Sequence, residues 1–110
     1  MLIDTHTHID LENFKDRFEE VLKNAHDNGV EKLVIPGTTP QGFERILKLC
    51  EKYENVYGAV GVHPEDLDAY NDSVPDILRQ YLTHPKIVAV GEIGLDYYWD
   101  KSRIERQKEI

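Results

Sequence analysis

Short apolar runs of strand length alternate with stretches of helical periodicity along the whole chain. The runs occupy residues 2–8, 33–35, 56–64 and 87–96. Between them, apolar residues recur at every third or fourth position, which is the spacing of an amphipathic helix with one apolar face. This alternation predicts right-handed β-α-β crossovers and therefore a parallel sheet of the α/β class.

Particular residues are expected to cap the N-termini of the predicted helices or to end them. The first helix has apolar residues on one face over 14–25, and Gly29 can end it because glycine tolerates the left-handed conformation. Thr39 is expected to cap the second helix. Ser73 and Ser102 are expected to cap the third and fourth, because each is followed three residues later by an acidic side chain.

Polar residues of functional interest fall at the carboxyl ends of the predicted strands. His8 ends the first run, His63 lies near the end of the third, and Glu92 and Asp96 lie in the fourth. In a (β/α)8 barrel, the loops at that rim build the active site, and a full barrel takes about 250 residues. We therefore predict that residues 1–110 form the N-terminal half of a TIM barrel, an incomplete domain. Part of the fourth strand should stay uncovered.

Composition and charge limit the partners and the compartment. The 110 residues carry a net charge of -8, from 21 acidic and 13 basic side chains, so nucleic acid should be bound locally rather than by a broad basic surface. No stretch approaches the roughly 20 apolar residues of a membrane span, and we expect no leader because the N-terminus lacks a basic start and a long apolar run. The single cysteine, Cys50, fits a reducing compartment. We expect a cytoplasmic protein that does not bind membranes.

His6 and His8 are candidate metal ligands. Side chains two residues apart on a strand point to the same face, so two neutral imidazoles could ligate one cation there. Alternatively, they are polar side chains at a strand end. Glu92 ends an otherwise apolar segment, and a buried carboxylate needs a cation, a hydrogen-bond donor or a proton. An ion pair with a lysine or arginine is the alternative. These donors suit Zn, Mn, Fe or Co, and Mg is also compatible.

Other residues near the predicted rim leave two interpretations open. His63 could contact a substrate, for example a phosphate oxygen, or could order its loop through a hydrogen bond. Asp96 could orient a metal ligand or could form a turn in "GLDYY". The aromatic cluster at residues 97–99 could stack on nucleic-acid bases or could cover the barrel edge.

Three motifs together resemble the N-terminal half of the TatD family of metal-dependent deoxyribonucleases. They are "DTHTHID", "GVHP" and "GEIGLDYY", in this order. The resemblance implies a TIM barrel with one or two divalent cations, two in a complete site, and hydrolysis of nucleic-acid phosphodiesters, as in 3'-5' exonucleases. It implies that His6 and His8 ligate one cation and that Glu92 is a catalytic carboxylate shared by both cations. His63 and Asp96 match family positions near the site.

The family pattern continues through four more strands, which supply two further histidines and a late aspartate. We therefore expect the chain alone to bind metal weakly and not to turn over substrate. A non-catalytic half-barrel, or a module that covers its open sheet edges by self-association, is the alternative. The opening Asp-x-His-x-His also resembles PHP phosphoesterases and amidohydrolases, and the segment "GEIGLDYY" favours the TatD family instead.

Overall fold

The strands form one parallel sheet in sequential order. A computed structural model describes residues 1–110. The strands are β1 (Leu2–Asp4), β2 (Val30–Pro36), β3 (Val56–Val60) and β4 (Ile87–Val90), paired in the order β1-β2-β3-β4. A doubly wound sheet would reverse its strand order part of the way across, whereas a barrel keeps the order of the chain. The predicted parallel (β/α) arrangement of half a TIM barrel is confirmed.

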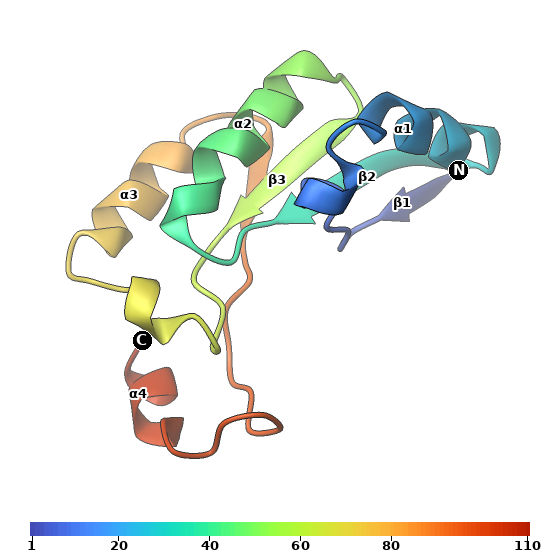
Figure 1. Ribbon diagram of the computed structural model, residues 1–110. Helices are drawn as coiled ribbons and strands as arrows, with labels where there is room; N and C mark the ends of the chain where they lie inside the picture. Colours follow the sequence, from blue (N-terminus) through green and yellow to red (C-terminus); the bar gives the residue numbers. More distant parts are fainter.

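Helices connect neighbouring strands and cover one face of the sheet (Figure 1). They are α1 (Phe18–Asp27), α2 (Phe43–Lys52) and α3 (Val74–Tyr81), preceded by the 3-10 turns η1 (Glu12–Phe14), η2 (Pro40–Gly42) and η3 (Leu67–Ala69). The last helix, α4 (Ile104–Glu109), lies apart from the sheet and next to η3 (Figure 1). None of these helices combines the length and the apolar character needed to cross a bilayer.

The core lies between the two central strands and helices α1 and α2. Its buried members are Ile9, Phe18, Leu22, Leu33, Ile35, Phe43, Ile46, Cys50, Val56, Val60 and Ile87. Gly58 lets α2 approach β3 closely, because a Cβ atom there would come within 2.7 Å of the Ile46 side chain. The buried position of Cys50 confirms that this residue belongs to the apolar face of its helix.

The observed helix ends differ from several predictions. The first helix begins at Phe18, and Phe14 lies in the separate turn η1. No side chain of Thr39, Ser73 or Ser102 makes a capping hydrogen bond. Both serines bond backwards instead, to an Asn or Asp two residues earlier, which is the local competition that such side chains offer to helix capping. The predicted stop is confirmed, since Gly29 has a φ of +89°.

The first, third and fourth strands end earlier than their apolar runs. β1 ends at Asp4, before both histidines, and β4 ends at Val90, before Glu92. The candidate functional residues therefore lie in the loops that follow the strands. The expected exposure of the fourth strand is also confirmed, because Val88, Ala89 and Val90 are all exposed.

Candidate metal centre

Three loops at the carboxyl ends of β1, β3 and β4 carry the candidate residues, and all three are fastened to the end of β2. Thr7 lies between the two histidines of the first loop. The anchoring hydrogen bonds run from Thr7 N–H to Val34 O (3.1 Å), from His63 N–H to Thr38 O (2.9 Å) and from Glu92 N–H to Gly37 O (2.6 Å). The backbone therefore fixes where each loop leaves the sheet.

The Glu92 carboxylate lies among three imidazoles. Its Oε1 is 3.5 Å from Nε2 of His6 and 3.8 Å from Nε2 of His63, and its Oε2 is 3.3 Å from Nε2 of His8. In a flat sheet, β1 and β4 would lie three strand spacings apart, about 14 Å. Contacts this short between loops of the two outer strands require the sheet to curl, as it does in a barrel.

His6, His8 and Glu92 form a group that fits a divalent cation. Their ligand atoms all lie within 4.8 Å of one another. Imidazole nitrogens and a carboxylate oxygen are the donors that Zn, Mn, Fe and Co accept in proteins. The Glu92 side chain is 20% exposed and that of His6 is 56% exposed, so the group is open to solvent on one side.

Histidines surround the Glu92 carboxylate. Its partners are histidines, and no lysine or arginine forms an ion pair with it. The Glu92 side chain, at 20% exposed, is also less buried than the apolar residues around it in the sequence predict. An arrangement of imidazoles around one carboxylate favours a shared cation over a simple ion pair.

His63 faces the same carboxylate with a fixed ring orientation. Its Nδ1 accepts a hydrogen bond from the backbone N–H of Glu65 (3.0 Å). Since an N–H group can only donate, Nδ1 is unprotonated, and the proton of the neutral ring is on Nε2. The loop-ordering hydrogen bond is therefore present, and Nε2–H remains free to donate towards the site.

Asp96 lies outside the group of three ligand residues. Its Oδ1 accepts the backbone N–H of Tyr98 (2.9 Å), which makes a turn. The side chain of Gln107 holds its backbone on both sides: Oε1 accepts the Asp96 N–H (2.8 Å), and Nε2 donates to the Asp96 carbonyl (2.8 Å). Of the two interpretations of Asp96, the structure therefore shows the turn-forming one.

Two further residues have surroundings that the sequence reasoning did not predict. Gln107 is buried on α4 although glutamine is usually exposed, and its side chain is hydrogen-bonded to the backbone of Asp96. Asp10, two residues after His8, has an Oδ1 atom with no hydrogen-bond partner. Burial raises the pKa of the Asp10 carboxyl, against the opposing effects of its backbone hydrogen bond, His8 and Arg45.

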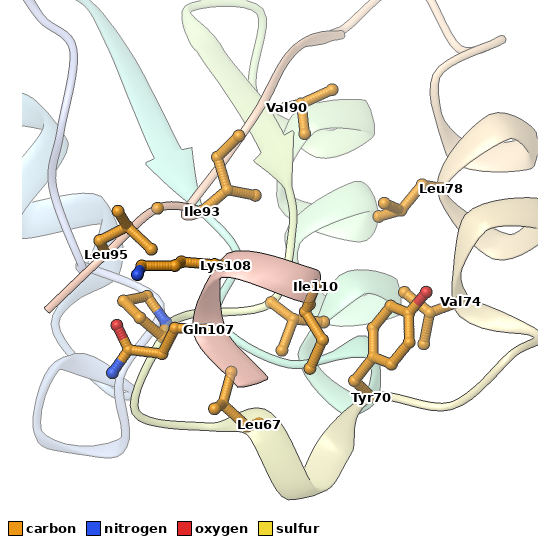
Figure 2. A pocket seen from close by; sticks show the side chains of 13 residues that line it. Leu67, Tyr70, Val74, Leu78, Val90, Ile93, Leu95, Gln107, Lys108 and Ile110 are labelled. Carbon is orange, nitrogen blue, oxygen red and sulfur yellow. The ribbon is translucent and has the colours of Figure 1, made fainter. Parts of the chain in front are cut away.

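An apolar cavity of about 510 Å³ lies between η3, α3, α4 and the loops that follow β3 and β4. Figure 2 shows side chains of η3, α3 and α4 pointing into it, with Val90 of β4 on one side. Ile93 and Leu95, in the loop after β4, also line it. None of the three ligand residues takes part in this cavity.

Comparison with known proteins gives a consistent set of similarities. The family model described as TatD related DNase matches residues 3–110. The crystal structure of YjjV, a TatD homologue from Escherichia coli K12, is 41% identical with a TM-score of 0.89, and the match covers 98% of this chain and 42% of that one.

Two curated relatives extend this comparison. The uncharacterized metal-dependent hydrolase YabD of Bacillus subtilis is 38% identical over 112 residues, which is 100% of this chain and 43% of the relative. The 3'-5' ssDNA/RNA exonuclease TatD of Escherichia coli is 33% identical over 94 residues, 86% of this chain and 36% of the relative. The chain thus spans about two-fifths of the length of the curated relatives it matches.

Proposed function

Since this chain belongs to the family of TatD-related DNases, we propose that it contributes metal ligands to a metal-dependent hydrolase that cleaves phosphodiester bonds of single-stranded nucleic acid. Residues 1–110 are, in this proposal, the first four β-α units of the hydrolase domain. The observation that carries the proposal is the convergence of His6, His8 and Glu92 within 4.8 Å. The names of YabD and of the E. coli exonuclease support the metal and the substrate class.

We assign His6 and His8 to one divalent cation and Glu92 to a position shared between two cations in the whole protein. Oε1 of Glu92 faces His6 and Oε2 faces His8, so these three side chains would hold the first cation together. When bound, the cations supply Lewis-acid activation of water and stabilise the leaving oxygen of the phosphodiester. Mg, Mn, Zn, Fe and Co all remain compatible with these donors.

His63 is assigned to the substrate rather than to a cation. Its Nε2 carries the proton while Nδ1 accepts the Glu65 N–H, so the ring presents a donor and no lone pair to the site. A donor at this place can bind an anionic phosphate oxygen and orient it beside Glu92. Asp96 is assigned a supporting role, through the turn that it forms in the Glu92 loop.

A chimeric protein tests the proposed activity. Residues 1–110 would be joined to the part of the E. coli exonuclease TatD that follows its aligned segment. We expect Mg²⁺- or Mn²⁺-dependent degradation of single-stranded DNA from the 3' end, lost in a Glu92→Gln variant. The matched control is Glu65→Gln, which removes an exposed carboxylate near the same rim. Absence of cleavage by a folded, metal-binding chimera, or cleavage that survives Glu92→Gln, would refute the proposal. The 110-residue chain alone is expected to be inactive.

Self-association is the second candidate, and the exposed apolar residues of the outer strands favour it. Leu2 and Ile3 on β1 and Val88 and Val90 on β4 are all exposed, and open strand edges can pair with another chain. The net charge of -8 opposes close contact between two copies. A defined dimer in analytical ultracentrifugation, retained by Glu92→Gln, would favour this candidate.

A further inference from the structure

Two large aromatic side chains are exposed on the loop between β4 and α4. Tyr98 is 78% exposed and Trp99 is 73% exposed. Their ring centroids are 4.7 Å apart, and the ring planes are nearly perpendicular, at 88°. An edge-to-face pair covers one face of one ring and leaves the other ring faces open. Two adjacent open ring faces on the surface are a feature of binding sites for flat ligands.

The loop holds this ring pair in place through hydrogen bonds on both sides. Tyr98 donates its backbone N–H to the Asp96 carboxylate (2.9 Å), and the backbone of Asp96 is held by the buried side chain of Gln107. On the other side, Ser102 donates its N–H to Asp100 (2.8 Å). A binding surface that is ordered before the ligand arrives loses less entropy on binding. The buried Gln107 thus serves to fix the aromatic pair relative to α4.

The aromatic pair is on the same loop as Glu92. Trp99 follows Glu92 by seven residues, so the two lie no more than about 25 Å apart. A single strand of several nucleotides bound at the metal-ligand group could therefore also reach the rings.

Local charge around the rings does not favour phosphate binding. Asp96 and Asp100 flank the pair, and the nearby Arg103 is bound to Asp68 (2.9 Å). Lys101 alone adds a positive charge that no ion pair occupies. Contacts through ring faces, rather than through charge, are what this surface offers.

We propose that Tyr98 and Trp99 form a stacking platform for the bases of single-stranded nucleic acid, held in position by Gln107. The proposal rests on the proposed function for its substrate class. Bases of a single strand expose their faces and stack on aromatic side chains with little sequence preference. Bases inside a duplex are stacked on one another, so the platform selects single strands.

Trp99 is the only tryptophan, so intrinsic fluorescence reports on the platform directly. We would titrate a short oligothymidylate into the 110-residue chain in the presence of EDTA, which excludes both metal binding and hydrolysis. The expected result is saturable quenching, with much weaker quenching by a duplex of equal length. Stacking also predicts that the binding affinity depends only weakly on salt. The slope of log K against log[salt] should be much shallower than for several phosphate contacts, each of which contributes about 0.7. Absence of quenching, or equal quenching by the duplex, would overturn the proposal.

Variants separate the platform from its support. With a labelled oligothymidylate and fluorescence anisotropy, Trp99→Ala should weaken binding about tenfold, and Trp99→Phe should retain most of the affinity. Gln107→Leu keeps both rings but releases the loop, so its affinity should also fall. Leu82→Ala, an exposed site just after α3, should bind like the wild type.

Two results contradict the inference without touching the proposed function. One is equal affinity of the wild type and Trp99→Ala. The other is a Trp99 signal that changes with protein concentration but not with oligonucleotide, which would show that the rings cover a contact between copies.

Discussion

The two central strands and the two outer strands contain the same kinds of residue but have very different surroundings. Ile35, Val56 and Val60 on β2 and β3 are completely buried, whereas Ile3 on β1 is 50% exposed and Val90 on β4 is 48% exposed. Apolar residues thus determine which segments become strands, and neighbouring elements determine which strands are covered. The candidate metal centre is built on the loops of the exposed strands, and those loops are fastened to the buried ones.

The largest expected effect comes from truncating a central strand. Ile35→Ala should lower the free energy of unfolding by about 2–5 kcal/mol, because a fully buried side chain leaves a cavity. Val90→Ala should lower it by less than about 1 kcal/mol, because half of that side chain already contacts solvent. Urea denaturation followed by circular dichroism measures both. Equal losses would show that the two regions do not differ in packing as described.

Substitution of Gly61, where the loop after β3 contacts the loop after β4, should have an intermediate effect on stability. A Cβ atom at Gly61 would lie 2.6 Å from the Glu92 carbonyl oxygen, so Gly61→Ala must displace backbone that carries the metal-ligand group. We expect a loss of about 1–3 kcal/mol in stability, together with weaker metal binding.

Gly42→Ala is the matched control for that substitution. No atom lies within 4 Å of a Cβ built at Gly42, and its φ of -91° suits alanine. Its stability should be unchanged or raised by up to about 1 kcal/mol. A Gly61→Ala variant that behaves like Gly42→Ala would contradict the close approach of β3 to the Glu92 loop.

The smallest effect concerns pH and the packed thiol of the central region. Burial raises the pKa of Cys50 to about 11, so the folded state retains its proton where the unfolded chain has lost it. The resulting stability is fully present below the unfolded pKa and is lost as pH rises through about 11. The wild type should therefore lose about 1 kcal/mol more than Cys50→Ala near pH 10. Parallel pH profiles of the two variants would contradict the burial.

Elements with a strong periodicity of apolar residues were predictable from the sequence, whereas the ends of strands and helices were not. The apolar spacing of α2 and the Val-rich segments of β2 and β3 predict their elements because packing demands that spacing. Strand ends escaped prediction because apolar residues such as Ile93 and Leu95 continue past β4, where they line a cavity rather than pair in the sheet. The serine caps failed because Asn71 and Asp100 compete for the same hydroxyls.

Prediction of the candidate site was limited in a similar way. Motifs drew attention to His6, His8, His63 and Glu92, and the structure brings these four together. The contribution of Gln107 could not be read from the sequence, because its partner Asp96 is eleven residues away and offers only backbone groups. Contacts to backbone leave no side-chain pattern to recognise.

Metal binding by the 110-residue chain tests the central claim most directly. Mn²⁺ would be titrated into the wild type, Glu92→Gln and the control Glu65→Gln, with free Mn²⁺ followed by electron paramagnetic resonance. We predict weak binding of Mn²⁺ by the wild type and by Glu65→Gln, and an affinity at least about tenfold lower for Glu92→Gln. Mn²⁺ should also raise the melting temperature of the first two proteins only. Equal Mn²⁺ affinity in all three proteins would show that His6, His8 and Glu92 do not form a metal centre.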